Sequence, residues 1–247
     1  MNLDWSVLLQ AESLIALGTL TLLEIVLGID NILFISIVSS KLPKDQQPRA
    51  RVIGLALALV FRLILLSLIS VLVQFKEPLF TLFSQEFSGR DLILLAGGIF
   101  LLVKTIREIH HKAEGELEES EKPKPKSFGG VIFMIILVDM VFSFDSILTA
   151  VGMVSELSIM IVAVVISMII MLVFVNKISA LIERHPSIQM LALSFLILIA
   201  FVLILDGFHV EIERGFVYFA LFFSLMVEIL NIRSTRKKKM QSKYGND

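Results

Sequence analysis

Seven long apolar runs constrain the fold of this 247-residue chain more than any other feature. A helix that crosses the hydrocarbon core of a bilayer needs about 20 mostly apolar residues. Runs of this kind cover residues 13–39, 50–75, 89–106, 128–154, 157–181, 188–205 and 215–232. Charged residues make up only 18% of the chain, against about 25% in ordinary soluble domains. The sequence therefore predicts an all-α, polytopic membrane protein with seven transmembrane helices.

The basic residues fall almost entirely on one side of these predicted spans. Of the 22 Lys and Arg residues, 17 lie in alternate connecting segments and in the C-terminal tail. The opposite segments hold only Lys76, Arg90 and Arg214, while Arg62 and Lys104 lie within spans. Because cytoplasmic segments are enriched in Lys and Arg, we predict an outside N-terminus and an inside C-terminus. No basic region precedes the first run, so we expect a retained span rather than a signal peptide.

A charged segment divides the predicted spans into two groups. Residues 107–127 carry charges of both signs and two prolines, which is typical of a solvated cytoplasmic linker. We expect a first three-helix unit over residues 1–106 and a second over residues 128–206. Residues 207–247 then hold the seventh helix and a basic tail. Residues 78–87, with phenylalanines among polar side chains, predict either a segment in the membrane interface or a plain loop.

Composition and missing motifs exclude several kinds of chemistry. The chain has no cysteine, so a thiolate metal site, a disulfide and a cysteine nucleophile are all excluded. Its formal net charge of −1 disfavours a nucleic-acid partner. The Gly-rich phosphate-binding motif of nucleotide-driven transporters is absent. The Gly-x-Gly-Asp signature of intramembrane aspartyl proteases is absent as well, and we do not expect an enzyme.

An internal repeat places acidic residues inside two of the predicted spans. With an offset of 115 residues, the motif LEIVLGIDNILF (23–34) aligns with VDMVFSFDSILT (138–149). The polar positions match in kind: Glu24 with Asp139, Asp30 with Asp145, and Asn31 with Ser146. Three spans separate the two copies, so they cross the membrane in opposite senses. We predict two inverted three-helix repeats plus one extra helix, an architecture in which transporters commonly bind substrate near the midplane.

The four acids of this repeat form the centre of the predicted metal site. A carboxylate at the middle of a spanning helix costs about 2.5–3.5 kcal/mol on insertion scales, and protonation or a bound cation relieves that cost. All the ligands are hard oxygens, which suit Mn²⁺, Mg²⁺ or Ca²⁺ better than Zn²⁺ or Cu⁺ and leave Na⁺ and H⁺ open. The predicted ligands are Glu24, Asp30, Asn31, Asp139, Asp145 and Ser146.

The spacing of the motif also predicts broken or kinked helices. On a regular helix Asp30 points about 120° away from Glu24, so an unbroken helix does not direct both carboxylates to one point. Gly28 and Ser143 lie between the acids of the two copies, where a local unwinding would be useful. We therefore expect discontinuous or kinked helices at these two positions, with freed carbonyls as further ligands.

Three further charged residues are candidate gating or charge-compensating groups: Arg62, Lys104 and Glu228. Arg62 falls near the middle of the second span, and we hypothesise that it pairs with one of the acids when no cation is bound. Lys104 falls near the inner end of the third span, where its side chain reaches the interface. Glu228, near the inner end of the last span, lines an inner gate or meets lipid headgroups. In a purely structural alternative, the acids are only buried and hydrogen-bonded, or paired with these cations.

These motifs also resemble those of a known family. The runs LEIVLGIDNILFIS and VDMVFSFDSIL and the Glu-Arg-His-Pro segment at 183–186 are similar to the TerC family of bacterial integral membrane proteins. The resemblance covers nearly the whole chain and implies a fold grouped with LysE-type exporters. It also implies a role in manganese export and an association with tellurite resistance. The acidic intramembrane positions of the family then correspond to Glu24, Asp30, Asp139 and Asp145.

The residues and the resemblance together lead us to expect a secondary transporter of the bacterial inner (plasma) membrane that exports Mn²⁺ by alternating access. Coupling to H⁺ or Na⁺ is expected, because carboxylates that bind either metal or protons couple the two directly. One alternative is a non-transporting membrane partner in a tellurite- or metal-stress resistance complex. Another is export of a cationic amino acid, as in LysE relatives. The choice between Mn²⁺ and Ca²⁺, the coupling ion and the oligomeric state stay open.

Overall fold

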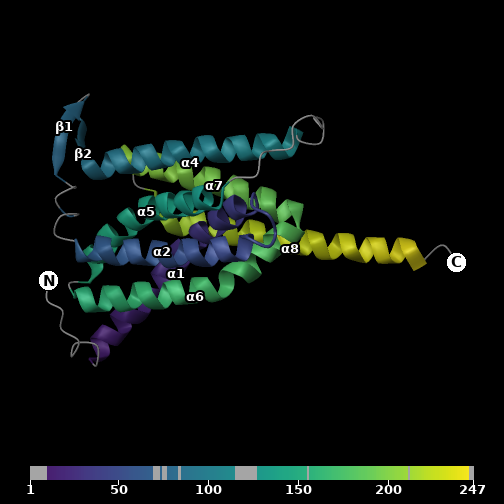
Figure 1. Cartoon of the computed structure of the whole chain (residues 1–247), viewed down its shortest axis with the longest axis horizontal. Helices are drawn as coiled ribbons and strands as arrows, with labels where there is room; N and C mark the ends of the chain where they lie inside the picture. Colours follow the sequence, from purple (N-terminus) through teal and green to yellow (C-terminus); the bar gives the residue numbers. More distant parts are fainter. Residues whose placement is uncertain are drawn as a thin grey trace.

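The computed structural model is a bundle of long helices with a small β-hairpin at one end (Figure 1). It describes residues 10–68, 73, 77–82, 85–114, 127–154, 156–210 and 212–244. The elements in chain order are α1 (Ala11–Ser39), α2 (Gln47–Ser67), β1 (Pro78–Leu82), β2 (Gln85–Ser88), α4 (Gly89–Glu114), α5 (Phe128–Met153), α6 (Leu157–Arg184), α7 (Pro186–Gly207) and α8 (Arg214–Tyr244). Below, the end of the bundle that carries β1 and β2 is the hairpin end. The opposite end, where α4 finishes and α5 begins, is the linker end.

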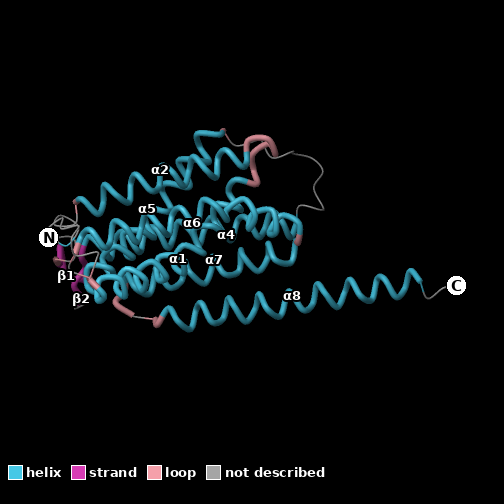
Figure 2. Tube along the Cα trace, turned by 90° about the horizontal axis from the view of Figure 1, so that it is seen from below, coloured by secondary structure: helices cyan, strands magenta, loops and turns pink. Residues whose placement is uncertain are grey.

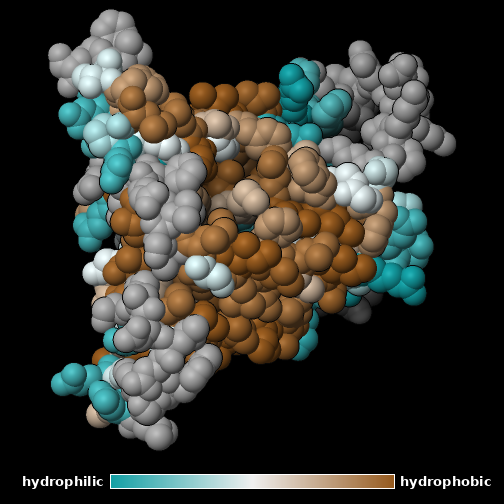
Figure 3. All heavy atoms as spheres, turned by 60° about the vertical axis from the view of Figure 1, so that its left-hand side comes forward, coloured by the Kyte–Doolittle hydropathy of each residue, from teal (hydrophilic) through white to brown (hydrophobic). Residues whose placement is uncertain are grey.

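Six helices are long and apolar enough to cross a bilayer: α1, α2, α5, α6, α7 and residues Gly215–Ser234 of α8. The predicted third span, α4, is not among them; its apolar residues 92–103 are bounded by Asp91 and Lys104. Apolar side chains form a broad belt on the face shown in Figure 3, with hydrophilic residues toward its margins. The predicted helical membrane architecture is therefore confirmed for six helices, while the seven-span count and the orientation stay predictions.

The main helix pairs join the two halves of the chain. α1 packs along α6, α2 along α5, and α4 along α7, so each helix before the linker has its principal partner after it. α8 runs along the outside of this bundle and extends beyond it at the linker end (Figure 2). Only 6% of its segment Gly215–Ser234 is buried, which marks α8 as a peripheral helix.

Helices α1 and α5 continue through the acidic motifs without a break, so the predicted discontinuities at Gly28 and Ser143 are wrong. Gly28 serves close packing instead, because a Cβ there would lie 2.3 Å from the Met171 sulfur on α6. The Ser143 hydroxyl donates to Asp139 Oδ2 at 3.0 Å, one turn earlier in the same helix. Both positions therefore lie within regular helix.

Residues 78–82 and 85–88 form the antiparallel pair β1 and β2, so the prediction of a plain loop at 78–87 is wrong, while the rest of the described fold is helical as predicted. Phe80 stacks on Phe87 with ring centroids 5.6 Å apart. Phe87 also meets the edge of Phe208, which follows α7, at 6.2 Å. Aromatic contacts of this kind stabilise strand pairs, and here they fix the hairpin over the ends of α4 and α7.

Two predicted boundaries differ from the helix ends. The predicted second span, 50–75, corresponds to α2, which ends at Ser67, and most of residues 69–76 lie outside the described residues. α4 continues to Glu114, well into the predicted linker at 107–127, where Glu108 pairs with Lys41 after α1. The remainder of that linker, 115–126, lies outside the described residues.

Close contact between α4 and α7 depends on Gly98. A Cβ at this position would lie 2.9 Å from the carbonyl oxygen of Ala200 and 2.7 Å from Cγ1 of Ile204, both on α7. Small residues at helix interfaces let backbones approach closely in membranes, where packing replaces the hydrophobic effect.

We expect Gly98→Ala to destabilise the protein by about 1–3 kcal/mol, because the added methyl group forces α4 and α7 apart. Thermal unfolding of the full chain in detergent, followed by circular dichroism, measures the effect. Gly18→Ala on α1 is the matched control, since a Cβ there meets no atom within 4 Å. Equal midpoints for the two variants would contradict the close contact.

Candidate functional site

The four repeat acids meet in two pairs, each made of one residue from α1 and its counterpart from α5. Glu24 and Asp139 share a common arginine, while Asp30 and Asp145 line the same cavity. All four side chains are at most 4% exposed. The helix pairing across the two halves thus brings together the residues that the sequence repeat aligns.

Arg62 on α2 lies between the carboxylates of the first pair. Its guanidinium donates to Glu24 Oε2 at 2.7 Å and to the two oxygens of Asp139 at 3.1 and 3.2 Å. Asp139 also accepts from Asn31 Nδ2 at 2.8 Å and from Ser143 at 3.0 Å. This cluster combines two formal negative charges with one positive charge in a place closed to solvent, so one negative charge is left over.

The side-chain amide of Asn31 contacts the first acid pair. Its nitrogen is bonded to Asp139, and the next residue before it in α1 is Asp30. Its oxygen, Oδ1, is buried and accepts no hydrogen bond from any described residue. Most buried amide oxygens have a partner, so this atom is a candidate ligand for an ion or a water molecule.

Asp30 and Asp145 line a cavity of about 30 Å³, called the small cavity below. The hydroxyl of Tyr218, on α8, lies 3.5 Å from Asp30 Oδ2. The rest of the wall is apolar: Leu27, Phe142, Ile199, Val202, Leu203 and Val217. Such a volume holds only one or two water-sized species. Because its wall is apolar, charges inside it interact strongly.

A larger cavity of about 380 Å³, called the vestibule below, reaches Asp145 from the hairpin end. Arg90 Nη2 donates to Asp145 Oδ1 at 2.6 Å. The neighbouring Asp91 accepts from the backbone and hydroxyl of Ser88 and lies 3.0 Å from His209 Nε2. Exposed His209 and buried Asp145 both line the vestibule, so the vestibule extends from the hairpin end to Asp145.

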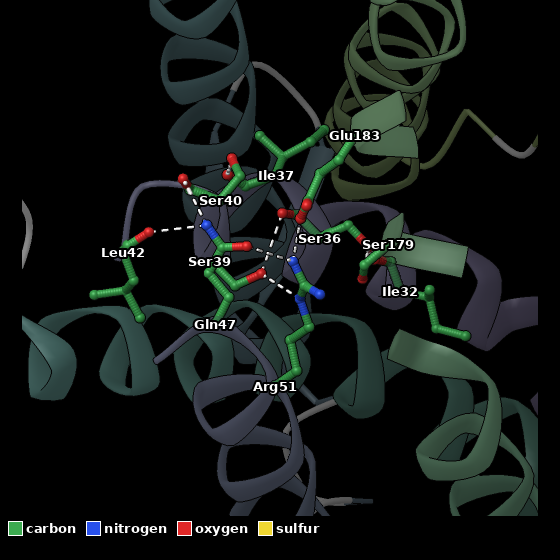
Figure 4. A network of polar contacts seen from close by, with 10 residues as sticks. All are labelled: Ile32, Ser36, Ile37, Ser39, Ser40, Leu42, Gln47, Arg51, Ser179 and Glu183. Atoms are coloured by element: carbon green, nitrogen blue, oxygen red, sulfur yellow. Dashed lines mark hydrogen bonds and ion pairs between the residues drawn. The ribbon is translucent and has the colours of Figure 1, made fainter. Parts of the chain in front are cut away.

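A polar network joins α1, α2 and α6 at the linker end of the bundle (Figure 4). We define this linker-end network as Ser36, Ser39, Gln47, Arg51, Ser179 and Glu183. Arg51 is buried, donates to Ser39 Oγ at 2.7 Å and forms an ion pair with Glu183. The hydroxyls of Ser36 and Ser179 lie 2.6 Å apart and connect α1 to α6. The network ties together the linker ends of α1, α2 and α6.

The remaining predicted site residues lie apart from these pairs. The Ser146 hydroxyl is buried and donates to the carbonyl of Ser143 at 3.3 Å rather than to an acid. Lys104 on α4 and Glu228 on α8 are half-buried, and among the described residues neither forms an ion pair with the four acids. Across the described ranges, no group of three or more His, Asp or Glu side chains is arranged to hold a metal ion.

Sequence reasoning missed Arg90 and Tyr218 as site residues. The sequence could have indicated Arg90, because it is one of only three basic residues on the predicted outer side and directly precedes an acid. Tyr218 had a weaker one, as one of only two tyrosines in the chain. Neither position repeats between the two motif copies, so the internal alignment did not select them.

Known proteins similar to this chain are membrane proteins. A family described as "Integral membrane protein TerC family" matches residues 9–243. The Escherichia coli "UPF0053 inner membrane protein YgdQ" is 53% identical over 226 residues, covering 92% of this chain and 95% of that protein. A Haemophilus influenzae "UPF0053 protein" is 45% identical, covering 92% and 97%. The Escherichia coli "UPF0053 inner membrane protein YoaE" is 47% identical over 86% of this chain but 41% of its own length. No solved structure matches the chain.

We expect Arg62→Met to destabilise the protein by about 3–5 kcal/mol, because two buried carboxylates lose their counter-charge. Denaturant unfolding of the full chain in detergent measures the loss. The triple variant Arg62→Met, Glu24→Gln and Asp139→Asn removes the three charges together and is expected to recover most of the stability. If it is as unstable as the single variant, charge compensation is not the role of Arg62.

Proposed function

This chain belongs to the TerC family of integral membrane proteins, and on that premise we propose that it transports a hard divalent cation, Mn²⁺ foremost, out of the cytoplasm. It is a multi-pass protein of the inner membrane, as its six apolar helices and its relatives named as inner membrane proteins indicate. The manganese assignment draws on the family resemblance, and the hard-cation chemistry draws on the residues.

The placement of Asp30 and Asp145 on one small cavity carries this proposal. Two carboxylates that face one apolar cavity favour a cation or a proton between them, and Arg90 already places one positive charge at Asp145. A single partly dehydrated ion fits the volume of about 30 Å³. Carboxylate oxygens are ligands that Mn²⁺, Mg²⁺ and Ca²⁺ prefer, and the apolar wall strengthens their attraction for the ion.

The other acid pair is proposed to hold the site in its cation-free state. Arg62 neutralises one of the charges of Glu24 and Asp139, and Asn31, the residue after Asp30 in α1, donates to Asp139 in the same cluster. When the ion binds, the carboxamide oxygen of Asn31 is available as a ligand. Arg62→Gln is therefore expected to change Mn²⁺ affinity as well as stability.

The pairing of the helices supports two inverted repeats. A twofold axis in the membrane plane that relates the two repeats would exchange α1 with α5, α2 with α6 and α4 with α7. Under this exchange, the α1–α6 pair becomes the α5–α2 pair. The α4–α7 pair is converted into itself. These are the principal pairs of the bundle, and transporters built on such repeats rock one half against the other around a central site.

Access to the site differs between the two ends of the bundle. The vestibule reaches Asp145 from the hairpin end, whereas the linker-end network joins α1, α2 and α6 (Figure 4). With the predicted orientation, the hairpin end is outside. We assign this arrangement to an outward-facing state, in which the linker-end network is the closed cytoplasmic gate. Protons or Na⁺ that enter the vestibule then compete with the metal for the carboxylates, which couples the two fluxes.

A role as a non-transporting partner in a resistance complex is the second candidate. α8 favours it, because 6% burial leaves most of its apolar surface facing outward. Phe216, Phe219 and Phe222 on this helix are exposed and suit contact with lipid or with a helix of another protein. In this alternative, replacing the acids alters folding, and the native protein itself carries no Mn²⁺ flux.

We expect Asp30→Asn and Asp145→Asn each to lower Mn²⁺ flux in proteoliposomes at least about tenfold, because each removes a charged ligand. The native protein is expected to move Mn²⁺ with an opposing proton or Na⁺ signal, recorded with a lumenal pH or Na⁺ probe. Asp45→Asn, at an exposed position, is the matched control and should retain flux. Both site variants are checked for intact folding by gel filtration. Flux that survives both substitutions would exclude these carboxylates as the transport site.

We expect Arg51→Gln to open the linker end, because it removes the pair with Glu183. The chain has no cysteine, so a single Ser179→Cys reports access to thiol reagents added from the linker side. The rate at which the reagent modifies this cysteine is expected to rise about fivefold or more, which is the lower end of the effects that coupled sites typically have on each other. Arg49→Gln, exposed on the same helix, is the control. An unchanged rate would exclude the Arg51–Glu183 pair as part of the gate.

A further inference from the structure

We propose that the linker end of α6 carries a binding site for the headgroup of an anionic phospholipid. A surface hollow of about 390 Å³, called the basic hollow below, is lined there by Lys177, Ala180, Leu181, Arg184 and His185. The lysine and the arginine each carry a positive charge, and none of the lining residues is acidic. This site is separate from the acid pairs, so the inference goes beyond the proposed transport function and does not depend on it.

The spacing of side chains along α6 forms the basic hollow. Lys177 and Arg184 are seven residues apart, which places them on the same face of the helix, two turns from each other. Ala180 lies between them on that face, and its small side chain leaves the space open. Both cationic side chains are long enough for their charged groups to meet at one phosphate bound between them.

The turn that follows α6 borders the basic hollow. His185 precedes Pro186, and its backbone is extended, with φ −128° and ψ 98°, as residues before proline commonly are. Its ring stays beside α6, because Nδ1 donates to the carbonyl oxygen of Leu181 at 3.1 Å. Arg184 and His185 are the part of the Glu-Arg-His-Pro segment for which the transport proposal has no role.

The two positive charges of the basic hollow are left for a partner outside the chain. Lys177 and Arg184 are exposed, and among the described residues neither forms an ion pair with a carboxylate. The adjacent acid, Glu183, pairs with Arg51 of the linker-end network instead. An anion that enters the basic hollow therefore has no carboxylate of the hollow to displace.

The apolar surface next to the basic hollow favours a lipid over a soluble anion. The Nζ atom of Lys177 lies 5.7 Å from the ring centroid of Phe174. Phe174, Val173 and Ile169 are exposed and lie further toward the middle of this candidate membrane span. Cations at the end of a span and exposed apolar side chains below them match the headgroup and the acyl chain of one phospholipid. With the predicted orientation, this lipid belongs to the cytoplasmic leaflet.

The test measures lipid binding to the purified full chain in detergent by native mass spectrometry. Phosphatidylglycerol is the anionic probe, and phosphatidylcholine, which carries a phosphate but no net charge, is the neutral one. We expect the native protein to bind one phosphatidylglycerol molecule more tightly than phosphatidylcholine. The double variant Lys177→Gln and Arg184→Gln is expected to raise the dissociation constant of this phosphatidylglycerol about 25-fold, because each Lys or Arg beside an anionic lipid contributes roughly fivefold.

Matched variants separate the basic hollow from general surface charge. Lys44→Gln combined with Arg49→Gln removes two charges from exposed positions at the same end of the bundle and is expected to leave binding unchanged. Phe174→Ala is expected to weaken phosphatidylglycerol binding, whereas Phe133→Ala, exposed on α5, is not. Glycerol 3-phosphate, which lacks acyl chains, is expected to compete only at concentrations more than about a hundredfold higher. Gel filtration checks that each variant is folded.

Each outcome either supports or overturns the lipid site. Loss of phosphatidylglycerol binding in the Lys177 and Arg184 variant, with normal binding in the Lys44 and Arg49 variant, supports it. Equal losses in the two variants would show attraction by surface charge alone and overturn it, as would equal binding of the two lipids by the native protein. Competition by glycerol 3-phosphate at the concentration of the lipid would assign the hollow to a soluble anion instead. The transport proposal is tested separately by Mn²⁺ flux, and none of these outcomes decides it.

Discussion

Burial of four carboxylates within helices of apolar surroundings is the constraint on which the rest of this structure depends. On insertion scales, four ionised acids would cost roughly 10–14 kcal/mol without partners. Two arginines lower this cost at different places: Arg62 between Glu24 and Asp139, and Arg90 on Asp145. Around Glu24 and Asp139, one arginine faces two carboxylates, so that cluster retains a formal negative charge. A retained charge of this kind is the physical basis of the proposed cation site.

The bundle places those charges by pairing helices across the two halves of the chain. α1 and α5 each carry one copy of the motif, and their contacts with α6 and α2 hold them face to face near the centre. Gly28 and Gly98 let neighbouring helices approach closely enough for this arrangement. As a result, each acid lies near its own repeat counterpart, and two unlike environments arise. One is closed around an arginine, and the other borders a cavity.

The two ends of the bundle differ in a way that gives the site a direction. At the hairpin end, aromatic contacts hold β1 and β2 beside the vestibule that leads to Asp145. At the linker end, Arg51 and the serine hydroxyls bridge three helices. Polar contacts of this kind can exchange for others during a conformational change more readily than a packed apolar core can be rearranged, which suits a transporter gate.

The sequence by itself determined the membrane setting, the helical architecture and the four acids, because apolar runs and a matched repeat are local patterns that survive without coordinates. The tertiary structure decided the rest. It showed that α1 and α5 are unbroken through the motifs and that Arg62 and Ser143 donate hydrogen bonds to Asp139. It also brought Arg90 and Tyr218 to the acids from α4 and α8. Neither residue belongs to the repeat, and contacts between residues distant in sequence depend on how helices pack, which a single sequence does not encode locally.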